Sequence, residues 1–326
     1  MNRVASRDGD ADVRLVTLLC GMALPLSAAA QVPHVGTQQR GGTYVEPPAV
    51  VDPIYTPRER SGSPEKESTG SGDGQPPLTL QLTLDMPLRS GGSAALGRGV
   101  QGSTAASPTV QAALRWTPLH DSWWFAQLVF HRYLRGARQQ AWHPDFSYAF
   151  GYEDFRPGTW SLVYANYTGT RLRPDARAGE GRFNFPHGQW TSSHRFALPA
   201  MLEPVLLVGD GDAALCSANA HLVPRYTDFR TGGERSAKKS LSLGCRYTRP
   251  EGWFGELALY GWPRRGEQQP WDPDFTYGFG YEDDGPGRLA VKYNNYSGNR
   301  FPGRGRGPGE GSFRSGSISL TWSAEW

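Results

Sequence analysis

The sequence predicts an all-β fold, a single antiparallel transmembrane β-barrel of about twelve strands with an internal repeat, over residues 78–326. Three observations predict it. Apolar and polar residues alternate beyond Pro77, segments 142–171 and 271–300 resemble each other, and the predicted connections are alternately long and short. The main alternative is a soluble β-sandwich, whose strands also alternate.

The composition allows a barrel and excludes a bundle of membrane helices. Hydrophobic residues make up only 38% of the chain and the mean hydropathy is −0.54. A spanning helix needs about 20 consecutive apolar residues, whereas only every second residue of a barrel strand faces lipid. The net charge of +3 does not indicate a nucleic-acid partner.

Residues 1–30 are predicted to be a secretory signal peptide. The apolar run 15–26 follows Arg14 and is too short to span a membrane, and Ala28 and Ala30 place small residues before a cleavage site near Ala30. Residues 31–77 are rich in Pro, Gly, Ser and mixed charge without periodicity, so we expect a disordered periplasmic segment. A plain linker and a partner-binding arm are both open for this segment.

The first and last predicted strands alternate in the manner expected of a sheet between lipid and a wet lumen. Leu78, Leu80, Leu82, Leu84 and Met86 share one face, as do Ile318, Leu320, Trp322, Ala324 and Trp326. The aromatic residue at the C-terminus resembles the terminal pattern by which outer-membrane barrels are recognised during assembly.

The internal repeat joins Trp142–Arg171 to Trp271–Arg300, with more than half of the positions identical. Each copy holds two strands that are joined by a Glu-Asp-x-x-Pro-Gly turn. Aromatic residues occupy one face of the first strand in both copies, namely Phe146, Tyr148, Phe150 and Tyr152, and Phe275, Tyr277, Phe279 and Tyr281.

The predicted connections alternate in length, apart from the longer segment 199–212. Long connections are expected at 89–108, 135–144, 169–188, 224–239, 263–273 and 298–311, with tight turns at 118–122, 154–158, 249–252 and 283–287. All long loops would then lie on one side of the membrane, with both ends of the barrel opposite. This is typical of long extracellular loops and short periplasmic turns.

Cys216 and Cys245 are nearly symmetric about a hairpin centred near Arg230 and share a face. We expect them to lie opposite each other, where the oxidising periplasm favours a disulfide; two buried free thiols are the alternative. No Cys/His spacing indicates a metal site, and no cofactor is predicted.

The alternation also assigns a polar lumen of mixed charge. Its predicted lining is Arg115, Gln127, His131, Glu153, Asn219, His221, Arg246, Glu256, Glu282, Arg288, Lys292 and Asn294. With aromatic residues such as Phe125 and Phe254, this wall is a candidate contact surface for neutral or zwitterionic carbohydrate. Alternatively, these side chains only brace a narrow or plugged lumen.

Further candidates lie at the predicted outer rim and on the lipid face. Trp142, Asp145, Trp271 and Asp274 are candidate carbohydrate contacts, or else girdle tryptophans that precede a turn. Loop arginines suit the phosphates of lipopolysaccharide, unless they are merely solvated. Ser192 and His194 share a lipid-facing side, but the His-x-Ser-Asn-Gly motif of outer-membrane phospholipases is absent, so no enzyme is predicted.

The repeated Asp-Phe-(Ser/Thr)-Tyr-x-Phe-Gly-Tyr, with Pro-Gly and Tyr-x-Asn-Tyr after it, resembles Gram-negative outer-membrane barrels associated with exopolysaccharide and cellulose-type export. The resemblance implies a passage for an exopolysaccharide or oligosaccharide across the outer membrane. It also implies separate periplasmic export proteins as partners, since the sequence lacks the periplasmic repeat domains of large secretion barrels. A non-transporting structural or surface-binding protein is the alternative, with a lipid-modifying enzyme behind it.

Overall fold

A computed structural model describes residues 78–88, 90–95, 101–105, 108–118, 123–134, 144–166, 170, 172, 183, 185–198, 209, 211–228, 231, 233–269, 272–283, 287–295, 299–304 and 313–326. For 90–95 and 101–105 only the backbone is described. The predicted signal peptide, the predicted periplasmic segment, Trp142 and Trp271 lie outside the described residues.

Twelve antiparallel strands form one closed barrel, in the order β1-β14-β13-β12-β11-β10-β9-β8-β7-β6-β5-β4. The fold prediction is therefore confirmed, and the β-sandwich is excluded. The strands are β1 (Leu78–Pro87), β4 (Thr109–Trp116), β5 (Trp124–Tyr133), β6 (Phe146–Tyr152), β7 (Trp160–Asn166), β8 (Gln189–Ala197), β9 (Ala213–Thr227), β10 (Glu234–Thr248), β11 (Trp253–Gly261), β12 (Phe275–Glu282), β13 (Arg288–Asn295) and β14 (Ser317–Glu325).

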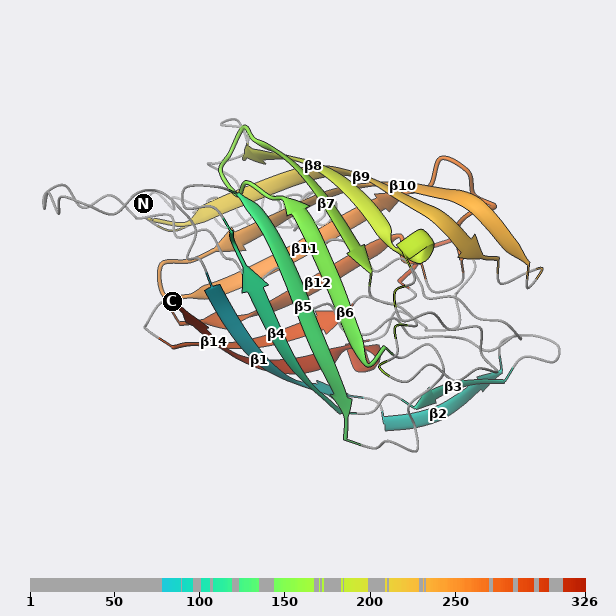
Figure 1. Ribbon diagram of the computed structural model, residues 1–326, viewed down its shortest axis with the longest axis horizontal. Helices are drawn as coiled ribbons and strands as arrows, with labels where there is room; N and C mark the ends of the chain where they lie inside the picture. Colours follow the sequence, from blue (N-terminus) through green and yellow to red (C-terminus); the bar gives the residue numbers. More distant parts are fainter. Residues whose placement is uncertain are drawn as a thin grey trace, which may run out of the picture.

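The first and last strands of the barrel pair with each other and close it. Leu84 lies opposite Leu320, and the Leu78 and Trp326 backbones exchange hydrogen bonds of 3.3 and 2.9 Å. We call the end that holds Leu78 and Trp326 the proximal end, and the opposite one the distal end. A separate hairpin of β2 (Ser90–Ala95) and β3 (Gln101–Ala105) lies outside the barrel beyond its distal end (Figure 1).

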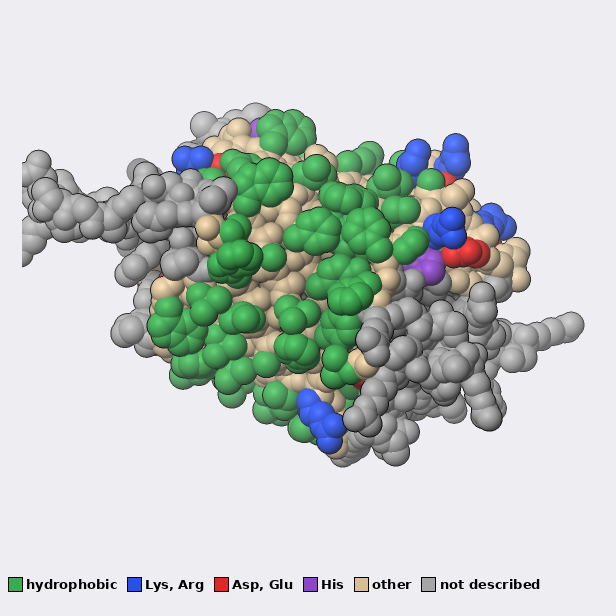
Figure 2. Space-filling model, in the orientation of Figure 1, with side chains coloured by type: hydrophobic (Ala, Val, Ile, Leu, Met, Phe, Trp, Pro, Cys, Tyr) green, Lys and Arg blue, Asp and Glu red, His purple; other side chains and the backbone are tan. Residues whose placement is uncertain are grey.

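The outer face of the barrel carries an exposed apolar belt, seen as a field of hydrophobic side chains in Figure 2. Leu82, Leu114, Leu162, Leu243, Leu289 and Leu320 are among its members. At the proximal end five tryptophans are more than half exposed, namely Trp116, Trp124, Trp160, Trp253 and Trp326. A closed barrel with an apolar belt and an aromatic girdle has the surface of a transmembrane barrel of the outer-membrane type.

Two aromatic clusters cover the outer face near the distal end, one in each copy of the repeat. Tyr164 stacks on Phe185 of the short helix η2 (Phe185–His187), with ring centroids 4.4 Å apart, and its hydroxyl donates to the Phe185 carbonyl at 2.8 Å. Tyr293 and Phe313 of η3 (Phe313–Ser315) do the same at 4.3 and 2.7 Å. The short helices η2 and η3 thus pack on the outside of the barrel rather than across its distal mouth.

The hairpin of β9 and β10 corrects one predicted connection. Residues 224–239 were expected to form a long loop, but each strand has 15 residues, and only 228–233 connect them. The hairpin therefore reaches beyond its neighbours at the distal end (Figure 1). Its tip lies past the lipid, where both faces of a strand tolerate polar side chains, so the alternation that marks a membrane strand is lost there.

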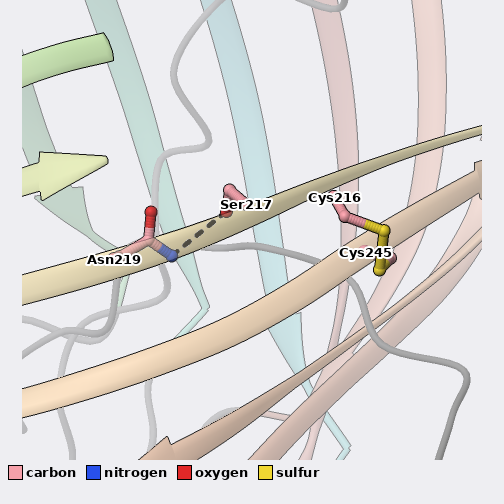
Figure 3. The surroundings of a disulfide bond; sticks show 4 residues. All are labelled: Cys216, Ser217, Asn219 and Cys245. Carbon is pink, nitrogen blue, oxygen red and sulfur yellow. Dashed lines mark hydrogen bonds between the residues drawn. A yellow bond between two sulfur atoms is a disulfide. The ribbon is translucent and has the colours of Figure 1, made fainter. Parts of the chain in front are cut away.

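Cys216 and Cys245 lie opposite each other in register and form the predicted disulfide, with an S–S distance of 2.00 Å (Figure 3). The pair lies on the outer face, whereas Ser217 and Asn219, which neighbour Cys216 on β9, face the interior. The disulfide therefore ties β9 to β10 from the lipid side.

Removing this disulfide is expected to destabilise the barrel. The bond closes a segment with a sequence separation of 29 residues, and a cross-link of that span restricts the unfolded chain by about 3–4 kcal/mol. The Cys216→Ser/Cys245→Ser variant should unfold at lower urea concentration in detergent, by gel-shift or tryptophan fluorescence. A reductant should lower the midpoint of the wild-type chain but not that of the variant; equal midpoints for variant and oxidised wild type would contradict the prediction.

Candidate functional site

The interior of the barrel is the candidate site. Along each strand, the residues between those of the apolar belt face inward, and most of them are polar and buried. All twelve residues predicted to line the lumen are on this inner face: Arg115, Gln127, His131, Glu153, Asn219, His221, Arg246, Glu256, Glu282, Arg288, Lys292 and Asn294. The structure brings most of them together as ion pairs.

The first of two recurring clusters, the first stack, consists of Arg115, Phe125, Gly151 and Glu153. The Arg115 guanidinium lies 3.8 Å above the Phe125 ring, and Phe125 is opposite Gly151 in register. Arg115 Nη1 is 3.0 Å from Glu153 Oε2, and the other Glu153 oxygen is 3.2 Å from Arg195 Nη2. One buried carboxylate therefore bridges two arginines.

The second stack repeats this arrangement with Arg246, Phe254, Gly280 and Glu282. Arg246 lies 3.9 Å above the Phe254 ring, Phe254 is opposite Gly280, and Arg246 Nη2 is 2.8 Å from Glu282 Oε2. In the closed strand order, β10–β12 lie six positions from β4–β6. The two stacks therefore occupy opposite walls of the lumen.

Glycine is required beneath each ring because the neighbouring backbone passes too close for a side chain. A Cβ at Gly280 would lie 2.2 Å from the Val291 carbonyl oxygen and 3.0 Å from Phe254. Gly151 would meet the Leu162 carbonyl at the same distance, and its φ of +153° also disfavours a side chain. In the repeated Phe-Gly-Tyr-Glu, the Phe and Tyr rings therefore face outward. The Gly faces inward and leaves space for the stacked phenylalanine ring of the neighbouring strand, and the Glu carboxylate also faces inward.

Two more ion pairs line the wall that carries the second stack. Lys292 Nζ reaches across β12 to Glu256 Oε1 at 2.6 Å, and Arg288 Nη2 is 3.2 Å from Glu325 Oε1. Gly278 on β12 leaves room for the first pair, because a Cβ there would lie 2.7 Å from Glu256 Oε1. Each carboxylate on the proximal half of the inner wall is therefore paired with at least one basic side chain.

The turn 153–159 brings an aromatic ring to the proximal mouth. Phe155 is 3% exposed and lies under the Arg195 guanidinium at 4.3 Å and near that of Arg115 at 5.6 Å. Burial by itself raises the pKa of the neighbouring Asp154 carboxyl, but hydrogen bonds and charge from Arg156, together with the charge of Arg195, lower it overall. Ionised Asp154 therefore stabilises this turn above the unfolded-state pKa of about 4, and its contribution is lost as the pH falls through the folded-state pKa.

Uncharged polar groups line the wall formed by β8, β9 and β10. His221 is hydrogen-bonded through Nε2 to Ser242 at 3.0 Å and through Nδ1 to Thr191 at 3.1 Å. Asn219 donates to the same Ser242 hydroxyl at 2.9 Å. This wall offers donors and acceptors without net charge.

The rim aspartates Asp145 and Asp274 hold neighbouring loop segments. Asp145 accepts the Leu172 amide at 3.1 Å, and Asp274 accepts that of Phe301 at 3.1 Å. Asp274, which is fully buried, also pairs with Arg300 and Arg304 at 3.3 and 2.9 Å. A carbohydrate contact at these residues stays a prediction.

The outward-facing Ser192 and His194 lie on the lipid side as predicted. His194 donates from Nδ1 to the Thr159 carbonyl at 3.1 Å, and its ring centroid is 4.7 Å from that of Trp160. Within the described ranges, no group of three or more His, Cys, Asp or Glu residues is placed to hold a metal ion.

Comparisons with known proteins concern the backbone shape. No family model matches the sequence, and no curated protein was found to be similar. Among solved structures, the NanC porin is 8% identical with a TM-score of 0.38, over 76% of this chain and 98% of its own. An outer membrane channel from Pseudomonas putida F1 is 13% identical with a TM-score of 0.37, over 77% and 96%. OmpF of Salmonella typhi, in complex with daunomycin, is 9% identical with a TM-score of 0.33, over 76% and 97%.

A side chain in place of Gly280, the glycine of the second stack, is expected to destabilise the barrel. Gly280→Ala should lower the free energy of unfolding by about 1–3 kcal/mol, the usual effect of overpacking, because its Cβ meets backbone at 2.2 Å. Gly261→Ala is the matched control, since nothing lies within 4 Å of a Cβ there. Urea unfolding in detergent compares the two variants. Equal midpoints would contradict the requirement for glycine at position 280.

Neutralising the bridging carboxylate of the first stack is also expected to destabilise the barrel. Glu153→Gln leaves two arginines facing each other without a counter-charge, and breaking such a buried pair costs about 3–5 kcal/mol. Glu251→Gln removes an exposed partner of Arg249, 3.3 Å away, and should change stability by less than about 1 kcal/mol. If both variants unfold at the wild-type midpoint, the first stack does not stabilise the fold.

Proposed function

We propose that this protein is an outer-membrane channel that lets small neutral or zwitterionic carbohydrates cross through the lumen of the barrel. The observation that carries the proposal is the pairing of each carboxylate on the proximal inner wall with a basic side chain. The ion pairs Arg115–Glu153, Arg246–Glu282 and Lys292–Glu256 have distances of 3.0, 2.8 and 2.6 Å.

Neutralised walls favour solutes without net charge. A ring of one sign would concentrate counter-ions in the lumen and make the pore ion-selective. Paired charges cancel at a distance, yet each group still presents hydrogen-bonding atoms to a solute close to the wall. Carbohydrate hydroxyls both donate and accept, so they match the paired wall as well as the uncharged wall around His221 and Ser242.

The proposal includes an orientation and partners. Short turns at the proximal end support a periplasmic location for it, and longer connections support an external distal end. The apolar belt would contact outer-membrane lipids, with lipopolysaccharide around the distal rim. Export of a polymer would need periplasmic export proteins, and we propose residues 31–77 as the segment that meets them.

A second candidate function is a non-transporting structural or surface-binding barrel. The tight packing of the inner wall favours it, because Arg115, Glu153 and Lys292 are each at most 5% exposed. Phe155 also occupies the proximal mouth. In this case the paired charges would brace a filled lumen.

Conductance in planar bilayers distinguishes the two candidates. We expect the mature chain to give steady openings with nearly equal permeability to potassium and chloride, and with partial block by oligosaccharides. Phe155→Ala should widen the proximal mouth and raise the conductance, whereas Phe130→Ala, on the outer face and 45% exposed, should leave it unchanged. An inserted but silent barrel, including the Phe155→Ala variant, would favour the structural candidate, and strong ion selectivity would overturn the neutral-solute proposal.

A further inference from the structure

We infer that the lumen holds a subsite for the ammonium group of an amine-bearing carbohydrate, formed by Asp85 and Gln111 just inside the distal mouth. This inference rests on the proposed function and names a substrate class for it. The subsite lies on the wall formed by β13, β14, β1 and β4, away from the glycines of both stacks.

Asp85 is the inward carboxylate that lacks a basic partner among the described barrel strands. It lies near the distal end of β1, is 5% exposed, and is opposite Ser319 on β14 and Thr109 on β4. One carboxylate oxygen accepts a hydrogen bond from the Ser317 side chain, and Oδ1 has no hydrogen-bond partner. Among the described barrel strands and the turn after β6, the other inward carboxylates each have a basic partner: Glu153, Glu256, Glu282 and Glu325.

A second acceptor without a donor lies on the neighbouring strand. Gln111 lies on β4 diagonally from Asp85, since its direct partner is Thr83, and its Oε1 has no hydrogen-bond partner. Gln111 is 3% exposed. Asn294 Oδ1 also has no partner, but Asn294 is on β13, beyond β14 and on the other diagonal from Asp85, so it lies outside the subsite.

Buried acceptors without donors are unfavourable, and leaving one unmet costs about 1–3 kcal/mol. Two of them on adjacent strands, one of them a carboxylate, are complemented by a group with several donors and a positive charge. An ammonium group has three donors and no acceptor, and a charged donor strengthens each bond to the carboxylate. A single hydroxyl supplies one donor and no charge.

The nearest internal ammonium is committed elsewhere. Lys292 lies in the same row as Asp85, because both are opposite Ser319. Its Nζ, however, reaches in the other direction to Glu256 at 2.6 Å. The geometry therefore leaves Asp85 for a ligand from solution rather than for a lysine of the wall.

The test compares three sugars as blockers of the mature chain in planar bilayers, below the pKa of the sugar amine. Glucosamine should block at a concentration at least about tenfold lower than glucose, the effect of one charge-assisted contact. N-acetylglucosamine, which has lost the charge, should behave like glucose. Asp85→Asn should abolish the preference for glucosamine, Asp85→Glu should restore part of it, and Glu251→Gln on the surface should retain it.

The remaining outcomes separate the subsite from the channel and from inorganic ions. Openings that all three sugars block equally would keep the channel and overturn the subsite. If no current is seen, calorimetric binding of glucosamine to the barrel in detergent, lost in Asp85→Asn, would keep the subsite and overturn the channel. Potassium or calcium ions that displace glucosamine at far lower concentration would show an inorganic cation site and overturn the inference. If Asp85→Asn fails to fold, Gln111→Leu serves in its place.

Discussion

The structure depends on one constraint: a backbone in lipid has no water to bond to, so every strand must have a neighbour on both sides. The pairing of β1 with β14 meets this constraint, since it joins the two edges of the sheet and leaves no exposed edge. The other features follow from closure. A closed sheet has one face toward lipid and one toward the lumen, so each strand must alternate, and the polar half of the sequence is enclosed in a narrow space.

Enclosure explains why the interior is organised as pairs and stacks. Charges removed from bulk water are tolerated only with partners, which is why Glu153 bridges two arginines and Lys292 crosses a neighbouring strand to Glu256. The aromatic rings beneath Arg115 and Arg246 need space on the inner surface, and glycines at the facing positions provide it. Because the residues of the two stacks recur, opposite walls carry the same arginine, phenylalanine, glycine and glutamate contacts. The walls differ elsewhere, since Arg195 joins only the first stack and the Lys292–Glu256 pair lies only beside the second.

Period-two alternation was sufficient to predict the strand faces, the inward position of residues such as Arg115 and Glu282, and the facing cysteines. It works because lipid on one side and polar groups on the other act on every second residue. It fails where this contrast ends, as at the tip of β9 and β10, where polar residues on both faces resembled a loop. It also cannot predict ion-pair partners, because Arg115 is on β4 and Glu153 follows β6, with β5 between them. The inward glycine after each repeated Phe was a usable signal for the stacks, whereas the missing partner of Asp85 becomes visible only with the whole wall assembled.

The place of the disulfide has a consequence for the order of events during biogenesis. Cys216 is 1% exposed on the lipid side, and Cys245 is opposite Leu257, four residues along β11 from the girdle tryptophan Trp253. Once the hairpin is embedded, a water-soluble oxidant or thiol–disulfide catalyst would have to enter the hydrocarbon layer to reach the two sulfurs. We therefore expect the bond to form while β9 and β10 are still in water, before the hairpin enters the membrane.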